Sequence, residues 1–330
     1  MEQQHHPLLA LDHLEAARAR LASHIRVTPT WEWSPDLLQE RARAPASVVF
    51  KLELFQHTGT FKVRASLNAM LMMDEDQRRR GVTAVSAGNH AVATAWAAAR
   101  LGIDAKILMP KTANPFRVEL TRSSGADIIF ADSHHAMFEM VREIEADEGR
   151  TFIHPFEGPA CVQGNATCGL EFVEQTAPVD VMVLPVGGGG LCTGFAAALR
   201  HFWPQVTIYG VEPAGADSMS QSFRSGKAEK LSAMNTIADS LAPPQAEPWT
   251  FARCRELVDD IVTVTDSEMR AAMRVLFSEM KLAVEPAGAA ATAGMLGPLR
   301  TRCEGKRVGI MVCGSNIDAG SYTRLLRQDD

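Results

Sequence analysis

The sequence predicts an α/β protein with open, mostly parallel sheets flanked by helices. Short runs of β-branched and apolar residues alternate with longer stretches of helical periodicity, and this alternation is typical of βαβ units. The chain has 330 residues, of which 46% are hydrophobic, which is enough to bury a large core and commonly divides into two lobes. Glycine or small polar residues follow several predicted strands, where ligands of parallel sheets bind.

The predicted elements follow one another in βαβ order along the whole chain. In the first half, strands are expected at 48–51, 83–85, 105–109 and 127–130, with helices at 61–73, 89–101 and 115–124. In the second half, strands are expected at 181–185, 206–211, 261–264 and 308–312, with helical patterns between most of them. Strands connected in this way pair in parallel and need helices on both faces of the sheet.

Composition and charge exclude several classes of protein. The net charge of −6 offers no basic surface to a nucleic acid. The six cysteines include no Cys-x-x-Cys pair, which argues against a zinc site and a disulfide framework and favours a reducing compartment. Neither an export signal nor an apolar run of membrane-spanning length is visible. We therefore expect a cytoplasmic protein with no nucleic-acid or membrane partner.

The most informative segment is Gly187-Gly188-Gly189-Gly190, which follows a predicted strand and precedes a helix that begins near Leu191. Glycine lets the backbone approach an anion closely, and the helix N-terminus adds partial positive charge. Four consecutive glycines exceed what a turn requires, so the segment favours a phosphate site over an ordinary turn. No Lys-Ser/Thr pair follows and the Gly-x-Gly-x-x-Gly spacing fails, which counts against a nucleotide.

Lys62 lies at the start of a predicted helix, directly after Thr58-Gly59-Thr60-Phe61. A lysine at a helix start beside an aromatic ring is a plausible Schiff-base amine, because burial and the positive helix dipole both lower its pKa. A single lysine in a polar loop is far more often a solvated surface residue. The segment therefore gains meaning only in combination with others.

Two further segments of small polar residues follow predicted strands. Ser86-Ala87-Gly88-Asn89-His90 opens a helix, where free N–H groups and Asn89 suit a carboxylate but would equally suit a simple helix cap. Val312-Cys313-Gly314-Ser315-Asn316 follows the last strand, where Cys313 either meets a ligand or is a buried structural thiol. Neither segment decides between its alternatives alone.

Taken together and in this order, the four segments resemble the fold-type II pyridoxal-phosphate (PLP) enzymes, in the branch of threonine/serine dehydratases (ammonia-lyases) and serine racemases. The similarity extends to His154-Pro155-Phe156, Gly210-Val211-Glu212-Pro213, Thr236-Ile237-Ala238-Asp239 and Glu285-Pro286-Ala287-Gly288-Ala289-Ala290. It implies a tryptophan-synthase-β-like fold of two open, mostly parallel twisted sheets. It also implies a large PLP-binding domain of residues 1–74 and 156–330 and a small domain of residues 75–155.

The resemblance further implies the roles of the site residues and the reaction. Lys62 would hold PLP as an internal aldimine, and Phe61 would cover one face of the cofactor ring. Asn89 would bond the ring hydroxyl, and Cys313 would face the pyridine nitrogen. The phosphate would be bound by Gly187, Gly188, Gly189, Gly190 and Leu191, and the substrate carboxylate by Ser86, Ala87, Gly88, Asn89 and His90. The implied enzyme is a carbon–oxygen lyase. It converts a β-hydroxy-L-amino acid to a 2-oxo acid and ammonia through an aminoacrylate.

Departures from the family pattern leave the substrate open. Gly164-Asn165-Ala166-Thr167 replaces a usual Gly-Gln-Gly-Thr, and Val63-Arg64-Ala65-Ser66 replaces a more usual Arg-Gly-Ala after the lysine. These changes either mark phenylserine or hydroxyaspartate as the substrate in place of threonine or serine, or they reflect packing drift.

A divalent cation is a further expectation from some relatives. Glu212 and the carbonyl of Ala216 match two ligand positions, whereas Ser218 stands where a second carboxylate is usual. Two oxygen ligands and water would hold Mg²⁺ or Ca²⁺ only weakly. We favour instead a Glu212 held by structural hydrogen bonds.

Two alternative functions remain at this stage. One is a PLP-dependent β-replacement enzyme of the cysteine-synthase kind, in which an external nucleophile captures the aminoacrylate. The other is a non-catalytic amino-acid- or dinucleotide-binding module, which would use the glycine loop but would not need Lys62. Since relatives are usually dimers or tetramers, we expect a homo-oligomer that takes a small amino-acid substrate.

Overall fold

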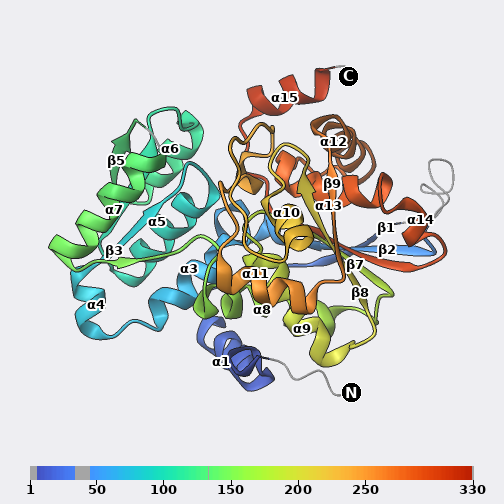
Figure 1. The fold of residues 1–330 in the computed structure, drawn as a ribbon, viewed down its shortest axis with the longest axis horizontal. Helices are drawn as coiled ribbons and strands as arrows, with labels where there is room; N and C mark the ends of the chain where they lie inside the picture. Colours follow the sequence, from blue (N-terminus) through green and yellow to red (C-terminus); the bar gives the residue numbers. More distant parts are fainter. Residues whose placement is uncertain (1–5, 34–44, 133, 329–330) are drawn as a thin grey trace.

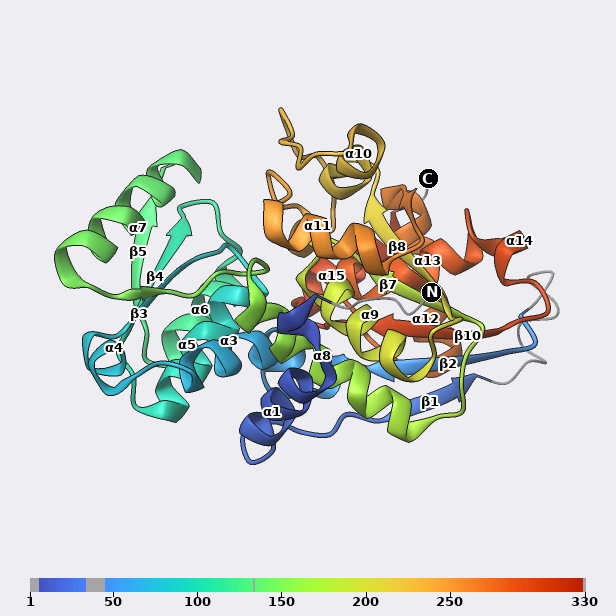
Figure 2. The same ribbon diagram turned by 60° about the horizontal axis from the view of Figure 1, so that its bottom comes forward.

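A computed structural model describes residues 6–33, 45–132 and 134–328. Two units lie side by side, each built on its own sheet (Figures 1 and 2). The larger sheet has six strands in the order β1-β2-β10-β7-β8-β9, and the smaller has four in the order β5-β4-β3-β6. Among the described strands, only β1 pairs antiparallel. The predicted α/β fold of two open, mostly parallel sheets is therefore confirmed.

The strands are β1 (Thr30–Trp33), β2 (Ser47–Leu52), β3 (Val82–Val85), β4 (Ala105–Pro110), β5 (Asp127–Ala131), β6 (Thr151–Phe152), β7 (Val181–Pro185), β8 (Thr207–Pro213), β9 (Asp260–Val264) and β10 (Arg307–Val312). The helices are α1 (Leu11–Leu21), α3 (Lys62–Leu71), α4 (Glu75–Arg80), α5 (Asn89–Leu101), α6 (Pro115–Ser123), α7 (His134–Glu148), α8 (Pro159–Gln175), α9 (Gly190–Phe202), α10 (Ser218–Ser225), α11 (Pro248–Leu257), α12 (Asp266–Met280), α13 (Pro286–Leu296), α14 (Arg300–Cys303) and α15 (Ala319–Arg327). A short 3₁₀ helix, η4 (Asp239–Leu241), lies between α10 and α11. No helix of the described residues is long and apolar enough to span a membrane.

Every strand that the sequence predicts is present, with ends that differ by at most a few residues. The sequence did not predict β1 and β6. The two residues of β6 are too few for a periodic pattern, and they form a strand only because Thr151 and Phe152 pair with Val82 and Thr83 of β3. Strand β1 is an antiparallel edge strand, whose existence depends on its neighbour β2.

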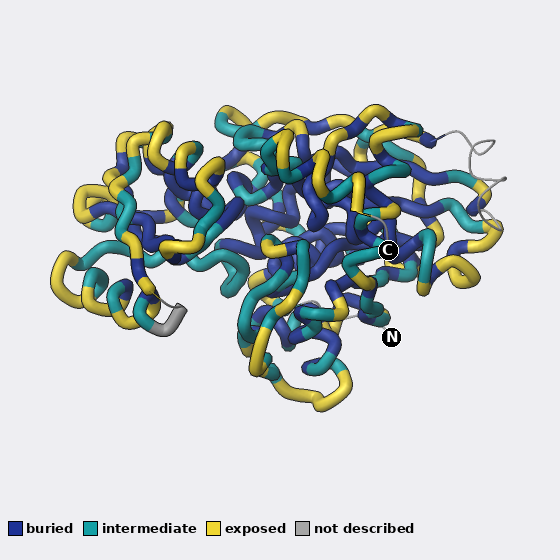
Figure 3. The backbone as a smooth tube through the Cα atoms, turned by 90° about the horizontal axis from the view of Figure 1, so that it is seen from above, coloured by how far each residue is buried: buried dark blue, intermediate teal, exposed yellow. Residues whose placement is uncertain are grey.

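Side-chain alternation places helices on both faces of the smaller sheet. Ala84 and Ile107 pack into one cluster with residues of α5, whereas Val85 and Leu108 pack into another with Met137 of α7. Successive residues of a strand point to opposite faces, so α5 and α7 cover opposite faces of this sheet. In Figure 3 the buried parts of the backbone lie mostly in the interior of each unit, with exposed segments around them.

Small residues bring the helices of the larger unit close to each other and to the sheet. Helix α13 runs along β7, β8, β9 and β10, and almost all of its alanine-rich length is buried. Helices α8 and α9 touch through backbone, because a Cβ at Gly194 would lie 2.4 Å from the carbonyl oxygen of Val162. This packing fixes the N-terminus of α9 at the carboxyl end of β7.

The carboxyl ends of three strands carry the segments singled out in the sequence. The glycine run follows β7, Cys313 follows β10, and Ser86 follows β3. Because the strands form two separate sheets, we propose that the chain divides into a large domain of residues 1–74 and 156–330 and a small domain of residues 75–155. In open α/β sheets, ligands generally bind at the carboxyl ends of the strands.

Candidate active site

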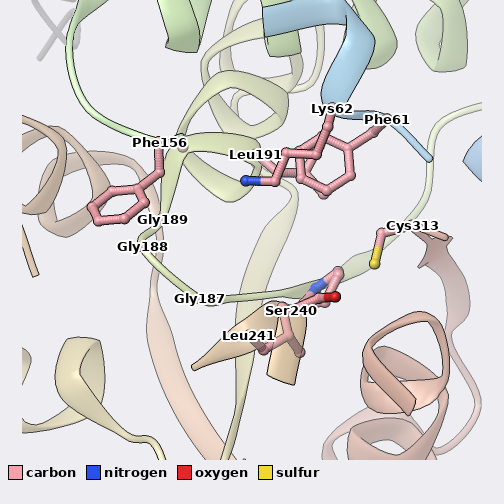
Figure 4. Close-up of a pocket in the computed structure, with 12 residues that line it drawn as sticks. Phe61, Lys62, Phe156, Gly187, Gly188, Gly189, Leu191, Ser240, Leu241 and Cys313 are labelled. Carbon is pink, nitrogen blue, oxygen red and sulfur yellow. The ribbon is translucent and has the colours of Figure 1, made fainter. Parts of the chain in front are cut away.

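One pocket collects most of the residues that the sequence singles out (Figure 4). It is lined by Phe61, Lys62, Phe156, Pro185, Gly187, Gly188, Gly189, Gly190, Leu191, Ser240, Leu241 and Cys313. The amine of Lys62 extends over the glycine loop toward Phe156, and Cys313 lies on the other side of the pocket. Residues Ser86 to His90 do not line it, but Asn89 reaches Ser240 at its edge.

Lys62 presents a desolvated amine to the pocket. Its Nζ donates a hydrogen bond to the carbonyl oxygen of Pro155 at 2.7 Å and lies 5.1 Å from the ring centroid of Phe61. The backbone N–H of Phe61 donates to the carbonyl of Cys313 at 3.2 Å, which ties the start of α3 to the end of β10. Burial lowers the pKa of the Lys62 amine, so the neutral, nucleophilic form is reached more readily than for a surface lysine.

Helix α3 is anchored by an ion cluster that the sequence analysis did not predict. Arg64 donates two hydrogen bonds to Glu53 and two to Glu171, each at 2.8 Å, and Lys51 binds the same Glu171 at 2.8 Å. The side chains of Arg64, Glu53 and Lys51 are fully buried. The only sequence signal for this cluster was the presence of charged residues, Lys51 and Glu53, in an otherwise apolar strand run. The cluster holds the helix that carries Lys62.

The glycine loop between β7 and α9 has the geometry of an anion site. Within the described part of the chain, no acceptor contacts the backbone N–H groups from Gly187 to Leu191. Gly189 has φ +86°, and a Cβ at Gly188 would lie 2.1 Å from the ring of Phe156. Free N–H groups at a helix N-terminus, with no side chain between them and the pocket, fit a phosphate.

Asn89 is held from both ends of its amide. Its Nδ2 donates to Glu285 Oε1 at 2.5 Å and to Ser240 Oγ at 3.3 Å, and its Oδ1 accepts from Asn316 Nδ2 at 2.9 Å. Burial raises the pKa of Glu285 to about 7, although its partner Arg117 acts in the opposite direction. No sequence pattern singled out Arg117, because nothing in its neighbourhood marks it as different from a surface helix residue.

The other residues of the segment after β3 serve partly structural roles. Gly88 N–H donates to Ser86 Oγ at 3.0 Å, and a Cβ at Gly88 would lie 3.2 Å from the guanidinium of Arg117. His90 Nε2 lies 2.7 Å from the carbonyl oxygen of Ile153. Burial first, and then Lys62, lower the pKa of His90 to about 3, so this imidazole is neutral.

Cys313 contributes a protonated thiol to the pocket. Its Sγ donates to the carbonyl of Ala287 at 3.4 Å. Burial first, and then the charge of Glu285, raise the pKa of the Cys313 thiol far above its usual range. The thiol therefore offers only weak hydrogen bonding and no charge at neutral pH.

Glu212 is occupied by the backbone of α10. Its two carboxylate oxygens accept hydrogen bonds from the N–H groups of Met219 at 2.9 Å and Ser220 at 2.7 Å, and burial raises its pKa well above the usual range. The described residues contain no cluster of three or more His, Cys, Asp or Glu side chains placed to hold a metal. The structural role of Glu212 and the weak cation site with Ala216 both stay predictions.

Fold and pocket together define a class of protein: an α/β enzyme that joins a desolvated lysine amine to a phosphate-binding glycine loop. The chain belongs to the family of pyridoxal-phosphate-dependent enzymes, whose family model matches residues 21–314. Its cofactor is therefore PLP, whose aldehyde and phosphate suit the amine of Lys62 and the N–H groups of the loop. Membership of this enzyme family counts against the alternative of a non-catalytic binding module.

Several similar proteins are named for related activities. The chain is 47% identical to phenylserine dehydratase from Ralstonia pickettii, over 96% of both chains. It is 36% identical to L-threo-3-hydroxyaspartate ammonia-lyase from Saccharomyces cerevisiae, over 96% of this chain and 95% of that one. The structure of maize serine racemase superposes with a TM-score of 0.89 at 34% identity, covering 95% of each chain.

The glycine loop gives a first prediction. The variant Gly188→Ala is expected to bind PLP about tenfold or more weakly, because the added methyl overlaps the Phe156 ring and overpacking of this kind costs roughly 1–3 kcal/mol. Titration of the cofactor-free protein with PLP, followed by visible absorbance, measures the change. Gly320→Ala is the control, since its Cβ would meet only Asp318 Oδ1, at 3.2 Å. Equal affinities for PLP in the two variants would contradict this geometry.

Proposed function

We propose that this chain is a PLP-dependent ammonia-lyase that dehydrates β-hydroxy-L-amino acids, with phenylserine as its preferred substrate. The observation that carries the substrate is the 47% identity to a phenylserine dehydratase across 96% of both chains. Relatives named as ammonia-lyases of threonine and of hydroxyaspartate, at 36% identity, support the reaction class.

The residues of the pocket supply binding and proton transfer. We assign the N–H groups from Gly187 to Leu191 to the cofactor phosphate, Phe61 to one ring face and Asn89 Nδ2 to the ring hydroxyl. Bound PLP supplies an electron sink for the bond broken at the substrate α-carbon. Lys62 fits the base at that carbon, because its lowered pKa leaves a larger share of the amine neutral near pH 7.

The remaining assignments concern charge. The thiol of Cys313 stays protonated, so we propose that it leaves the pyridine nitrogen largely without a proton, which favours elimination over other outcomes at the α-carbon. The backbone of Ser86 to His90, at the N-terminus of α5, is assigned to the substrate carboxylate. The neutral imidazole of His90 adds no competing charge there.

The charges around the pocket favour a substrate with an uncharged β-substituent. Arg117, the cation nearest Gly88, is already paired with Glu285 at 2.9 Å and Asp239 at 2.5 Å. A second substrate carboxylate beside Gly88, as in hydroxyaspartate, would lie near these two acids, and the Arg117 cation there is already paired. Phe156 and Leu241 line the pocket instead, and such apolar surfaces suit a phenyl group.

The proposal extends to the assembly state and the cellular compartment. All six cysteines are free and buried, which agrees with a reducing cytoplasm. We also propose a homo-oligomer, a dimer or tetramer, which sedimentation of the purified protein would test.

The test compares substrates on the purified holoenzyme. Phenylserine, threonine, serine and hydroxyaspartate are supplied as L-amino acids, and the 2-oxo acid and ammonia are measured. We expect kcat/KM for phenylserine to exceed that for threonine by about 10-fold to 200-fold, the range that one apolar pocket usually achieves. A preference for hydroxyaspartate would overturn the substrate. Consumption of substrate only with an added thiol, without 2-oxo acid, would instead indicate β-replacement.

A further inference from the structure

A closed ring of hydrogen bonds joins the two units beside the pocket. Arg117 Nη2 donates to Glu285 Oε2 at 2.9 Å, and Asn89 Nδ2 donates to Glu285 Oε1 at 2.5 Å. Asn316 closes the ring, because its Nδ2 donates to Asn89 Oδ1 at 2.9 Å and its carbonyl accepts from Arg117 Nε at 3.3 Å. Asn89 and Arg117 lie on α5 and α6 beside the smaller sheet, whereas Glu285 and Asn316 belong to the larger unit.

Arg117 is an unusual member of this ring because it is a buried cation. Only 6% of its side chain is exposed, and it binds Asp239 of η4 at 2.5 Å in addition to Glu285. A buried guanidinium is stable only with such partners, and removing one partner leaves the other charge uncompensated. A Cβ at Gly88 would lie 3.2 Å from Arg117 Nη1, so the guanidinium lies directly beside the start of α5.

The charge of Glu285 orients the Asn89 amide together with Asn316, whose Nδ2 donates to Asn89 Oδ1. An ionised carboxylate can only accept hydrogen bonds, so Asn89 must turn its N–H₂ toward Glu285. A protonated Glu285 can donate to Asn89 Oδ1 instead, and the amide is then held in its present orientation mainly by Asn316 Nδ2. This Nδ2 also donates to the carbonyl of Thr58 at 2.7 Å. Arg117 lowers the pKa of Glu285 against the effect of burial. The other titratable groups that face Glu285 are Asp239, Lys62 and Cys313.

We propose that Arg117 is a positioning residue for this reaction: by pairing with Glu285 it fixes the Asn89 amide with its N–H₂ toward the larger unit and the pocket edge. The inference rests on the proposed function, because the contact of Asn89 with the cofactor ring hydroxyl comes from that assignment. Arg117 itself does not line the pocket. It acts through Glu285, and its effect therefore depends on pH and on the presence of Glu285.

The main test is the variant Arg117→Gln. Its kcat is expected to fall on the order of 10²-fold, as for other losses of alignment. The acidic limb of its pH–kcat profile should move upward by about 1–3 pH units, the shift that an opposite charge causes in a neighbouring carboxylate. The pH midpoint of the visible absorbance of bound cofactor should move in the same direction. Arg117→Lys should recover part of both effects.

A matched control lies on the same helix. Arg122 of α6 is exposed and pairs with Glu119, one turn away, at 3.2 Å. The variant Arg122→Gln removes the same charge from the same helix without touching the ring. It should leave the pH profile, the absorbance midpoint and kcat unchanged, and an Arg117-like shift in this variant would overturn the proposal.

A double-mutant cycle separates action through Glu285 from direct effects. Glu285→Gln alone should remove the part of the acidic limb that Glu285 causes, and adding Arg117→Gln to it should change kcat and the limb little further. Equal losses in both backgrounds would mean that Arg117 acts on Lys62 or on folding, and would overturn the inference. If Arg117→Gln does not fold, Arg117→Lys and Glu285→Gln carry the same comparison. Failure of the proposed function is read separately, as wild-type protein that forms no 2-oxo acid.

Discussion

Replacing Lys62 by alanine is expected to abolish the visible absorbance of covalently bound cofactor and to lower kcat on the order of 10²–10⁴-fold, the usual contribution of a positioned acid–base group. The variant loses both the attachment point of PLP and the amine that we assign to the α-proton. The glycine loop and Asn89 remain, so PLP should still bind without the covalent bond. Absorbance spectra and the rate of 2-oxo acid formation measure the two effects.

A second experiment identifies chemically the lysine that binds the cofactor. Reduction of wild-type holoenzyme with borohydride should fix the cofactor on the peptide that contains Lys62, as read by mass spectrometry. Lys227→Ala serves as the control, because this side chain is 76% exposed and lies near Glu229 at the surface. Label on another lysine, or full activity in Lys62→Ala, would refute the assignment.

The largest loss of stability is expected for Arg64→Met. Among the residues that the structure describes, this substitution leaves Glu53 and Glu171 buried with Lys51 as their one remaining cation, and breaking a buried ion pair costs about 3–5 kcal/mol. Because Arg64 lies on the first turn of α3, the variant should also lose cofactor affinity. Denaturant unfolding of the cofactor-free protein gives the free energy, and PLP titration gives the second effect.

A surface pair provides the comparison for Arg64. Arg79 and Asp76 form an ion pair one turn apart on α4, with 73% and 64% of their side chains exposed, and such pairs contribute about 0–1 kcal/mol. Arg79→Gln should therefore unfold almost as the wild type does. A similar small loss for Arg64→Met would show that the buried cluster does not anchor α3.

The fold and the centre of the site could be predicted from the sequence because their signals are local. The alternation of apolar runs with helical periodicity predicted the strands of both sheets, and only the short β6 and the edge strand β1 were not predicted. The glycine run stood between a strand end and a helix start, where backbone geometry indicates a ligand, whereas Lys62 gained its role only from the four segments taken together. Parallel strands then bring these two segments into one pocket.

The sequence by itself therefore determined the fold class and the phosphate loop, since each depends on residues adjacent along the chain, and it indicated the reactive amine through the order of the four segments. Only the tertiary structure decided which charges surround them. Arg117 and Glu285 are 168 positions apart and Arg64 and Glu171 are 107 apart, so no spacing rule connects them. The physical reason is that a buried charge requires a partner in space, and that partner is chosen by how helices pack across two sheets.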